Sequence, residues 1–237
     1  MKVIGRNVGE AIEPLYREVE QRLATEGGGR RLEVTSTDDG ALSNVRWRAD
    51  HVAISVRKGI PTHALPHVLA VALQHVRQRL DGYPDVVRSD RAQPDGAGIA
   101  RTALRELVLA PEAEQRLEPL GLDDRWEAEQ RHKGLKQLLR DAGEDWNEPG
   151  TPAHQFAALS YARYALQHPP EMWESLGEAM RDQLPKATAS GDDVLALVSR
   201  HGWKDQATAL KTLTEVRDAL QMRPYTLIQD RRTGGFY

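Results

Sequence analysis

The chain has 237 residues, of which 40% are hydrophobic and 28% charged, with a net charge of −3. This balance is typical of a globular protein with a substantial core, and it argues against a disordered chain or one with the basic face of a nucleic-acid-binding protein. The absence of cysteine excludes disulfides and thiolate metal sites. The charged N-terminal segment is unlike a signal peptide, and no apolar stretch approaches the roughly 20 residues that cross a bilayer. We therefore expect a cytoplasmic protein without a membrane partner.

A helix, three strands and a second helix are predicted over residues 7–82. Apolar residues recur every three or four positions in 7–26, and the glycines at 27–29 end this first helix. The period then changes to two, which predicts three short strands. Their apolar positions are Leu32 and Val34, then Val45 and Trp47, then Val52, Ile54 and Val56. A broad apolar stripe between residues 65 and 80 predicts the second helix, which ends at Asp81 and Gly82.

Beyond a loop at residues 83–97, the sequence has helical periodicity almost to its end. The predicted helices cover 98–109, 111–120, 123–142, 152–167, 170–184, 192–201 and 203–222. Pro111 and Pro152 suit first helical turns, and Gly121 and Gly202 suit helix C-termini. The last residues lack this periodicity. They predict either a tail lying on its own domain or an arm that joins a second copy of the chain.

These elements predict an α+β fold. A small antiparallel three-stranded sheet near the N-terminus packs on helices and is followed by a mainly helical region. We expect a single domain over residues 1–237, with any seam near 88–98. Its parts are a helix-strands-helix part at 1–87, a helical part at 98–222 and a tail at 223–237.

The order of elements in residues 1–82 resembles the start of the catalytic core of zincin metallopeptidases. In that family the second helix carries His-Glu-x-x-His, in which two histidines bind zinc and the glutamate activates a zinc-bound water. The stretch Val71-Ala72-Leu73-Gln74-His75 resembles this motif and retains its final histidine. Residues 50–61 are similar to the edge strand that precedes the helix in zincins. The resemblance covers about residues 30–87.

The sequence departs from the zincin pattern at the positions that carry the chemistry. Val71 cannot bind zinc, and Ala72 cannot act as a base. The resemblance therefore implies an inactive metallopeptidase homologue, without catalytic residues or a cofactor, that acts by binding a partner, in the first place another protein. A zincin arrangement would place Val71, Ala72 and His75 on one helix face, in a groove beside an edge strand at 51–57. A chance resemblance would place 51–57 in the middle of the sheet.

One alternative is a zinc-dependent hydrolase with unorthodox ligands around His75. His67 and His154 are the other candidate metal ligands, but His67 and His75 are eight residues apart, about 12 Å along a helix, and cannot share one zinc. Glu129 and His132 have the three-residue spacing of a di-iron ligand pair. Because such a site needs two of these pairs, we interpret them as a solvated helix face.

A second alternative is a regulatory protein that contacts nucleic acid through arginines on the polar face of the sheet. The candidate residues are Arg46, Arg48 and Arg57. Acidic residues are interspersed among them, which favours an ordinary charged surface. We therefore do not expect nucleic acid as a partner. Self-association through residues 224–237 is a further prediction.

We predict that the purified chain carries well below one zinc per molecule, because Val71 removes a ligand position. Elemental analysis before any treatment with chelator measures this content. A stable one-to-one zinc content that disappears on changing His75→Ala would contradict the prediction and favour the hydrolase.

Overall fold

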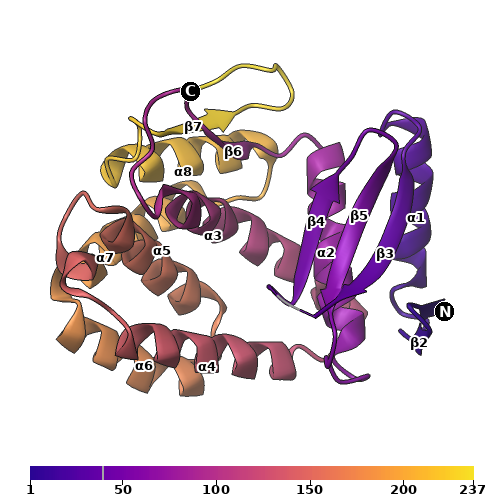
Figure 1. Ribbon diagram of the computed structural model, residues 1–237, viewed down its shortest axis with the longest axis horizontal. Coiled ribbons are helices and arrows are strands. Elements are labelled where there is room, and N and C mark those ends of the chain that lie inside the picture. Colours follow the sequence, from indigo (N-terminus) through magenta and orange to yellow (C-terminus); the bar gives the residue numbers. More distant parts are fainter. Residues whose placement is uncertain (39) are drawn as a thin grey trace. The chain divides into compact units, whose positions relative to one another are not determined.

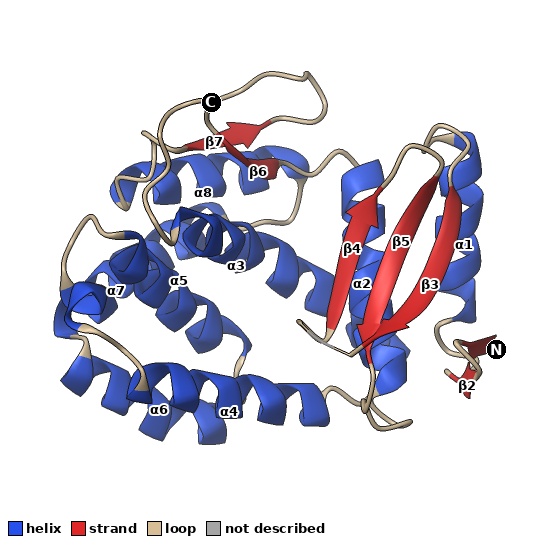
Figure 2. Ribbon diagram, in the orientation of Figure 1, coloured by secondary structure: helices blue, strands red, loops and turns tan. Residues whose placement is uncertain are grey.

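The computed structural model describes residues 1–38 and 40–237, and their helices and strands form an α+β fold (Figures 1 and 2). The chain divides into two compact units, each described by itself below. Unit 1 comprises residues 1–81 and 113–129, and unit 2 comprises residues 82–112 and 130–237. No helix in the described part of the chain is long and apolar enough to cross a membrane.

Unit 1 contains the N-terminal helices and the three-stranded sheet. Its elements are β1 (Lys2–Val3), β2 (Arg6–Asn7), α1 (Glu13–Thr25), β3 (Arg31–Thr37), β4 (Ser43–Trp47), β5 (His51–Arg57) and α2 (Leu65–Leu80). The end of α3 (Ala97–Leu117), the short helix η1 (Glu118–Leu120) and the start of α4 (Arg125–Arg140) complete it. The strand order is β3-β5-β4, and α1 and α2 lie on one side of this sheet (Figure 2).

Two predictions about the sheet are wrong. The sheet is mixed rather than antiparallel, because β5 runs parallel to β3 and antiparallel to β4. In addition, β5 is the central strand and not an edge strand. Its side chains Val52, Ile54 and Val56 are at most 1% exposed, as expected of a strand paired on both sides. Alternation in a sequence indicates which face of a strand is buried, but not which strands are its neighbours.

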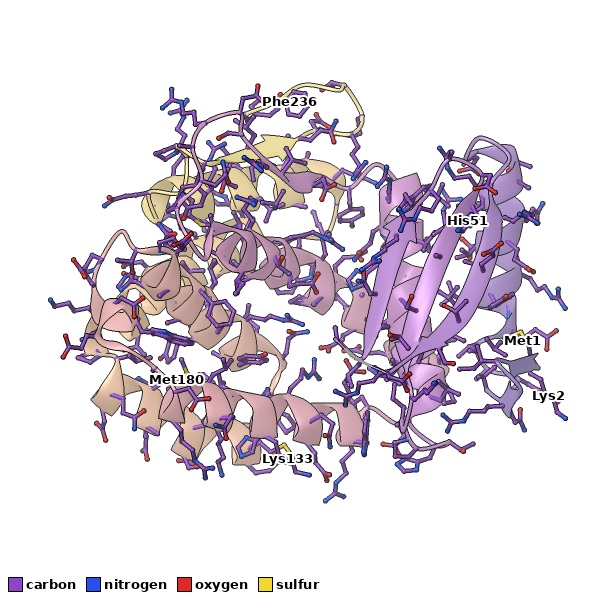
Figure 3. The ribbon with its side chains drawn as sticks, in the orientation of Figure 1. Met1, Lys2, His51, Lys133, Met180 and Phe236 are labelled. Atoms are coloured by element: carbon purple, nitrogen blue, oxygen red, sulfur yellow. The ribbon has the colours of Figure 1, made fainter. Side chains whose placement is uncertain are left out.

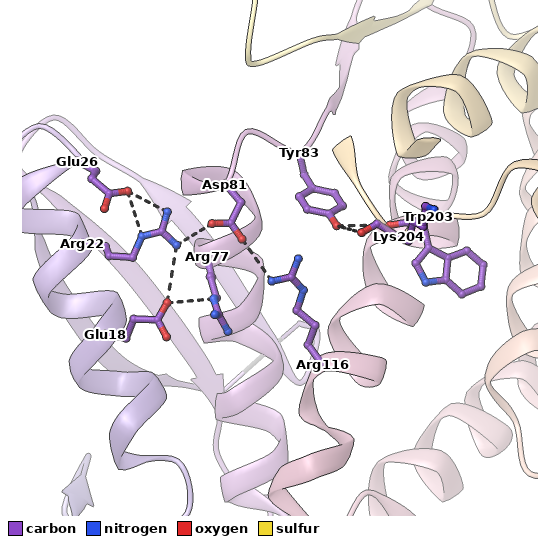
Figure 4. A network of polar contacts seen from close by, with 9 residues as sticks. All are labelled: Glu18, Arg22, Glu26, Arg77, Asp81, Tyr83, Arg116, Trp203 and Lys204. Carbon is purple, nitrogen blue, oxygen red and sulfur yellow. Dashed lines mark hydrogen bonds and ion pairs between the residues drawn. The ribbon is translucent and has the colours of Figure 1, made fainter. Parts of the chain in front are cut away.

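An ion-pair network at the C-terminal end of α2 joins three helices of unit 1 (Figure 4). Arg22 of α1 donates a hydrogen bond of 2.7 Å to the Asp81 carboxylate and pairs with Glu26 at 2.9 Å. The other oxygen of Asp81 lies 3.6 Å from Nη1 of Arg116 on α3. Asp81 is therefore a shared acceptor that fixes where α2 ends relative to α1 and α3.

Unit 2 is mainly helical. Its elements are β6 (Asp85–Arg88), the first part of α3, the rest of α4, η2 (Glu144–Asn147), α5 (Pro152–Gln167), α6 (Pro170–Gln183), α7 (Pro185–His201), α8 (Gln206–Ala219) and β7 (Thr226–Gln229). The bounds of α5 are those predicted from the sequence. Most of the other predicted helices are confirmed with ends that differ by a few residues.

Two helices of unit 2 differ more from their predictions. A single helix, α3, runs through Pro111, where the sequence predicted two helices; its apolar stripe continues on both sides of the proline, with Leu107 and Ala113 fully buried. Helix α7 begins at Pro185 rather than near residue 192. Its first turns carry small residues that pack on α5: a Cβ on Gly191 would lie 2.5 Å from Cδ1 of Tyr161. Small residues of this kind produce no apolar periodicity, so the start of α7 could not be predicted from the sequence.

The C-terminal tail folds onto unit 2. Strand β7 pairs antiparallel with β6, and the chain then turns back so that the amide and carbonyl of Ile228 bond to Tyr237 at 3.1 and 3.0 Å. Tyr225 is buried and Leu227 is half-buried, as expected of a tail that lies on its own domain, whereas Phe236, labelled in Figure 3, is 57% exposed. The tail is thus ordered on its own unit, whereas self-association through it stays a prediction.

We predict that Ile228→Ala lowers the free energy of unfolding by roughly 2–5 kcal/mol, because Ile228 is fully buried between the tail and the helices. The matched control Phe236→Ala, in the same tail, should change it by no more than about 0.5 kcal/mol. Urea denaturation of the full-length variants measures both values. Equal effects of the two substitutions would mean that the tail is not packed as described.

Candidate functional sites

The zincin-like residues of α2 lie together on one side of that helix. Ala72 is fully buried, whereas Val71 and His75 are half-buried. The Nδ1 atom of His75 is 2.8 Å from Oε1 of Gln78, one turn further along α2. The strand beside this helix that forms a sheet edge is β4, and not β5 as the zincin arrangement predicted. A central β5 is the position that a chance resemblance predicts.

The other candidate metal ligands have different surroundings. His67 is buried on α2, and its Nδ1 atom lies 2.9 Å from Oε2 of Glu127 on α4, so a carboxylate already orients this ring. His154 lies in unit 2, on α5, with Nε2 3.1 Å from the hydroxyl of Ser190. Burial lowers the pKa of His154, which keeps it neutral at pH 7.

The residues of α2 do not fit the zinc site of a zincin. Val71 and Ala72 have no donor atom, and the Nδ1 atoms of His67 and His75 face Glu127 and Gln78. Across residues 1–38 and 40–237, no group of three or more histidine, aspartate or glutamate side chains is arranged to hold a metal ion.

The outer face of the sheet carries two of the three candidate arginines. Arg46 of β4 and Arg57 of β5 alternate with the buried positions of their strands and so lie on the face turned away from α1 and α2. Arg48 follows β4, and its carbonyl accepts a hydrogen bond of 2.8 Å from Arg30. The same face carries a cluster of both charge signs, formed by Arg31, Glu33, Asp50 and His51 with separations of 2.8–3.7 Å. His51 is labelled in Figure 3.

A pair of histidines in unit 2 was not identified from the sequence as a site. His168 follows the last residue of α5 and is only 7% exposed, with its ring centre 5.9 Å from that of His132 on α4. The rings of Tyr164 and Trp173 lie 5.0 and 6.3 Å from it. Within the described part of the chain, neither nitrogen of His168 has a hydrogen-bond partner, nor has Nδ1 of His132.

Burial controls the charge of this pair. The pKa of His168 is lowered to about 4, mainly by burial, with contributions in the same direction from the positive charges of Arg131, His132 and Arg163. Burial likewise lowers the pKa of His132, with a contribution from Lys136. Both rings are therefore neutral at pH 7. His132 itself is half-buried, with its Nδ1 atom shielded from solvent. Sequence periodicity gave no signal for the pair, because its members are 36 residues apart.

Comparisons of the chain with models of known protein families, with curated protein sequences and with solved structures find no match. The geometry described above is therefore the observation on which a functional interpretation rests. Each of the three sites, the α2 face, the outer sheet face and the histidine pair, lies within one unit.

We predict that His168 makes the fold sensitive to acid. Its folded-state pKa of about 4 is below the ordinary value of about 6.5, so the unfolded chain takes up this proton first as the pH falls. The free energy of unfolding should therefore be unaffected above pH 6.5 and decrease between pH 6.5 and 4, by roughly 3 kcal/mol at most.

Urea denaturation across this pH range, together with an NMR titration of the imidazole, measures the effect. His168→Phe should flatten the pH dependence, while the control His63→Phe, at an exposed position, should not. A His168 titration midpoint near 6.5 would contradict the prediction.

Proposed function

We propose that the chain is a non-catalytic protein that acts by binding another protein through the uncovered face of the sheet in unit 1. The observation that carries this proposal is the contrast between the two sides of that sheet. One side is buried against α1 and α2, while the other presents polar and charged side chains next to the outer edges of β3 and β4. In the described residues, no strand of the chain pairs with either edge.

The composition of α2 supports a structural role for this helix. Ten of its sixteen residues are buried, among them Ala72 at the position where a zincin has its glutamate. A carboxylate at a fully buried position would have to be desolvated, which costs several kcal/mol unless it is paired. The helix thus supports the sheet by packing, and the sheet offers the surface for recognition.

The outer sheet face favours a protein over a nucleic acid as the partner. Arg46 and Arg57 share this face with the acidic side chains of Glu33 and Asp50, so it lacks the uniform positive charge that phosphate binding requires. A face with both charge signs suits a protein surface of complementary pattern. The edges of β3 and β4 can in addition pair with an extended segment of a partner through main-chain hydrogen bonds.

The proposal predicts a partner that contacts the sheet. A photo-crosslinking amino acid at Thr35 of β3 or Asn44 of β4, both exposed on the outer face, should give a protein adduct in the cells from which the sequence derives. The same amino acid at the exposed Glu174 of α6 should not. Changing Arg46→Glu should weaken the adduct formed at position 44, because it reverses one charge of the face.

Adducts of equal yield at positions 44 and 174, or none at either sheet position, would overturn the proposal. Hydrolysis of a peptide or ester by the purified chain that requires zinc and His75 would replace it with the hydrolase alternative. Mass spectrometry of the adducts and a peptidase assay with and without added zinc distinguish these results.

A further inference from the structure

A cavity of about 380 Å³ lies in unit 2 between α3 and α5. The two helices lie side by side with the same direction: a Cβ on Gly96, just before α3, would be 3.5 Å from Cβ of Pro152 at the start of α5, and Glu106 lies beside Arg163 further along both. The volume falls at the lower end of the range of about 300–1,000 Å³ for small-molecule sites. The cavity therefore follows two parallel helices, and its two ends can be assigned.

The lining of the cavity is divided into an apolar part and a charged end. The side chains that line it recur at helical spacing on each helix, so they belong to one face of α3 and one face of α5. The apolar part is formed by Ile99, Ala103, Phe156 and Leu159, and the charged end by Glu106 and Arg163. Ile99 is 60% exposed at the rim of the cavity. A ligand in the cavity would cover part of this apolar surface.

Among the described residues, Arg163 donates one side-chain hydrogen bond, from Nε, while its terminal nitrogens donate none. Its Nε donates a hydrogen bond of 2.6 Å to Gln167, and its guanidinium lies 5.8 Å from the ring centre of Tyr164. The tip nitrogen Nη2 is 3.9 Å from Oε2 of Glu106, too far for a hydrogen bond. The side chain is only 21% exposed, so an anion that reached it would bind in a partly desolvated environment, where a charge-assisted hydrogen bond is strong.

We infer that this cavity binds a small amphipathic carboxylate, with its carboxyl group on Arg163 and its apolar chain along α3 and α5 toward Ile99. The distance along α3 from Ile99 to Glu106, seven residues, is about 10 Å. A medium-length fatty acid or a similar aryl carboxylate has this reach. Glu106 limits the charge of the ligand: a single carboxylate can approach Arg163 beside it, whereas a doubly charged phosphate would be repelled more strongly. This site is separate from the sheet face to which we assign protein binding.

Isothermal titration calorimetry of the full chain with octanoate tests the inference, with octan-1-ol and octylamine as ligands of the same chain length. We expect octanoate to bind and the alcohol and the amine to bind at least about tenfold more weakly, the usual loss for one charged hydrogen bond. Arg163→Gln should weaken octanoate binding by about tenfold or more. Arg105→Gln is the matched control, because Arg105 also lies near Glu106, at 3.7 Å, but does not line the cavity. It should leave the affinity within about twofold of the unmodified chain.

A second variant keeps the test decisive if Arg163→Gln fails to fold. Ile99→Asp, at an exposed rim position, should fold normally and weaken octanoate binding, since it adds a negative charge and removes apolar contact. Three results would overturn the inference: no octanoate binding at millimolar concentration, equal binding of octanoate and octan-1-ol, or octanoate binding that Arg163→Gln and Ile99→Asp both leave unchanged. Tighter binding of the zwitterion phenylalanine than of octanoate would also overturn it, because Glu106 would then be a recognition group.

Discussion

Burial of α2 against the inner face of the sheet is the interaction on which the rest of unit 1 depends. The helix and the central strand β5 both supply side chains that are almost completely removed from water, and α1 packs on the same layer. Each fully buried valine, leucine or isoleucine contributes about 1.5–3 kcal/mol relative to an exposed one. The chain has no disulfide to add to this, so removal of apolar surface from water carries the stability of the unit.

Two buried histidines differ in whether a hydrogen-bond partner compensates for the burial of the polar ring. His67 in unit 1 has a carboxylate at 2.9 Å, which compensates for the loss of water. His168 in unit 2 has aromatic neighbours and no acceptor among the described residues, so its burial is compatible only with the neutral ring. The difference follows from position: His67 faces Glu127 in the first turn of α4, whereas His168 lies near the arginines of α4 and α5.

Sequence patterns predicted the features that depend on neighbours in the chain and missed those that depend on distant ones. The helical period gave the bounds of α5, and the period of two located β3, β4 and β5. The strand order, the carboxylate partner of His67 and the pairing of β6 with β7 join segments that no local pattern connects. The cavity between α3 and α5 is likewise formed by segments that are distant in the sequence. The spacing of Ile99, Ala103 and Glu106 was visible in the sequence, but the helix that they face was not.

The site predictions were limited for a related reason. The apolar stripe of residues 65–80 located α2, whereas the resemblance to the zincin arrangement assigned the wrong strand to the edge of the sheet. The arginines on the outer sheet face were predicted from alternation alone, which does place Arg46 and Arg57 on that face. Whether they act in recognition depends on a partner that the chain itself does not contain.

The pairing of β6 with β7 joins two segments of unit 2 that are far apart in the sequence and are therefore synthesised at different times. During synthesis, β6 leaves the ribosome long before β7 exists; Asp85 and its partner Arg231 are 146 residues apart. At 5–20 residues per second, the first strand waits on the order of 10 s for the second. Unit 2 can therefore complete its fold only after β7 has left the ribosome, and a chain that is truncated before β7 leaves β6 as an open strand edge exposed to other nascent chains.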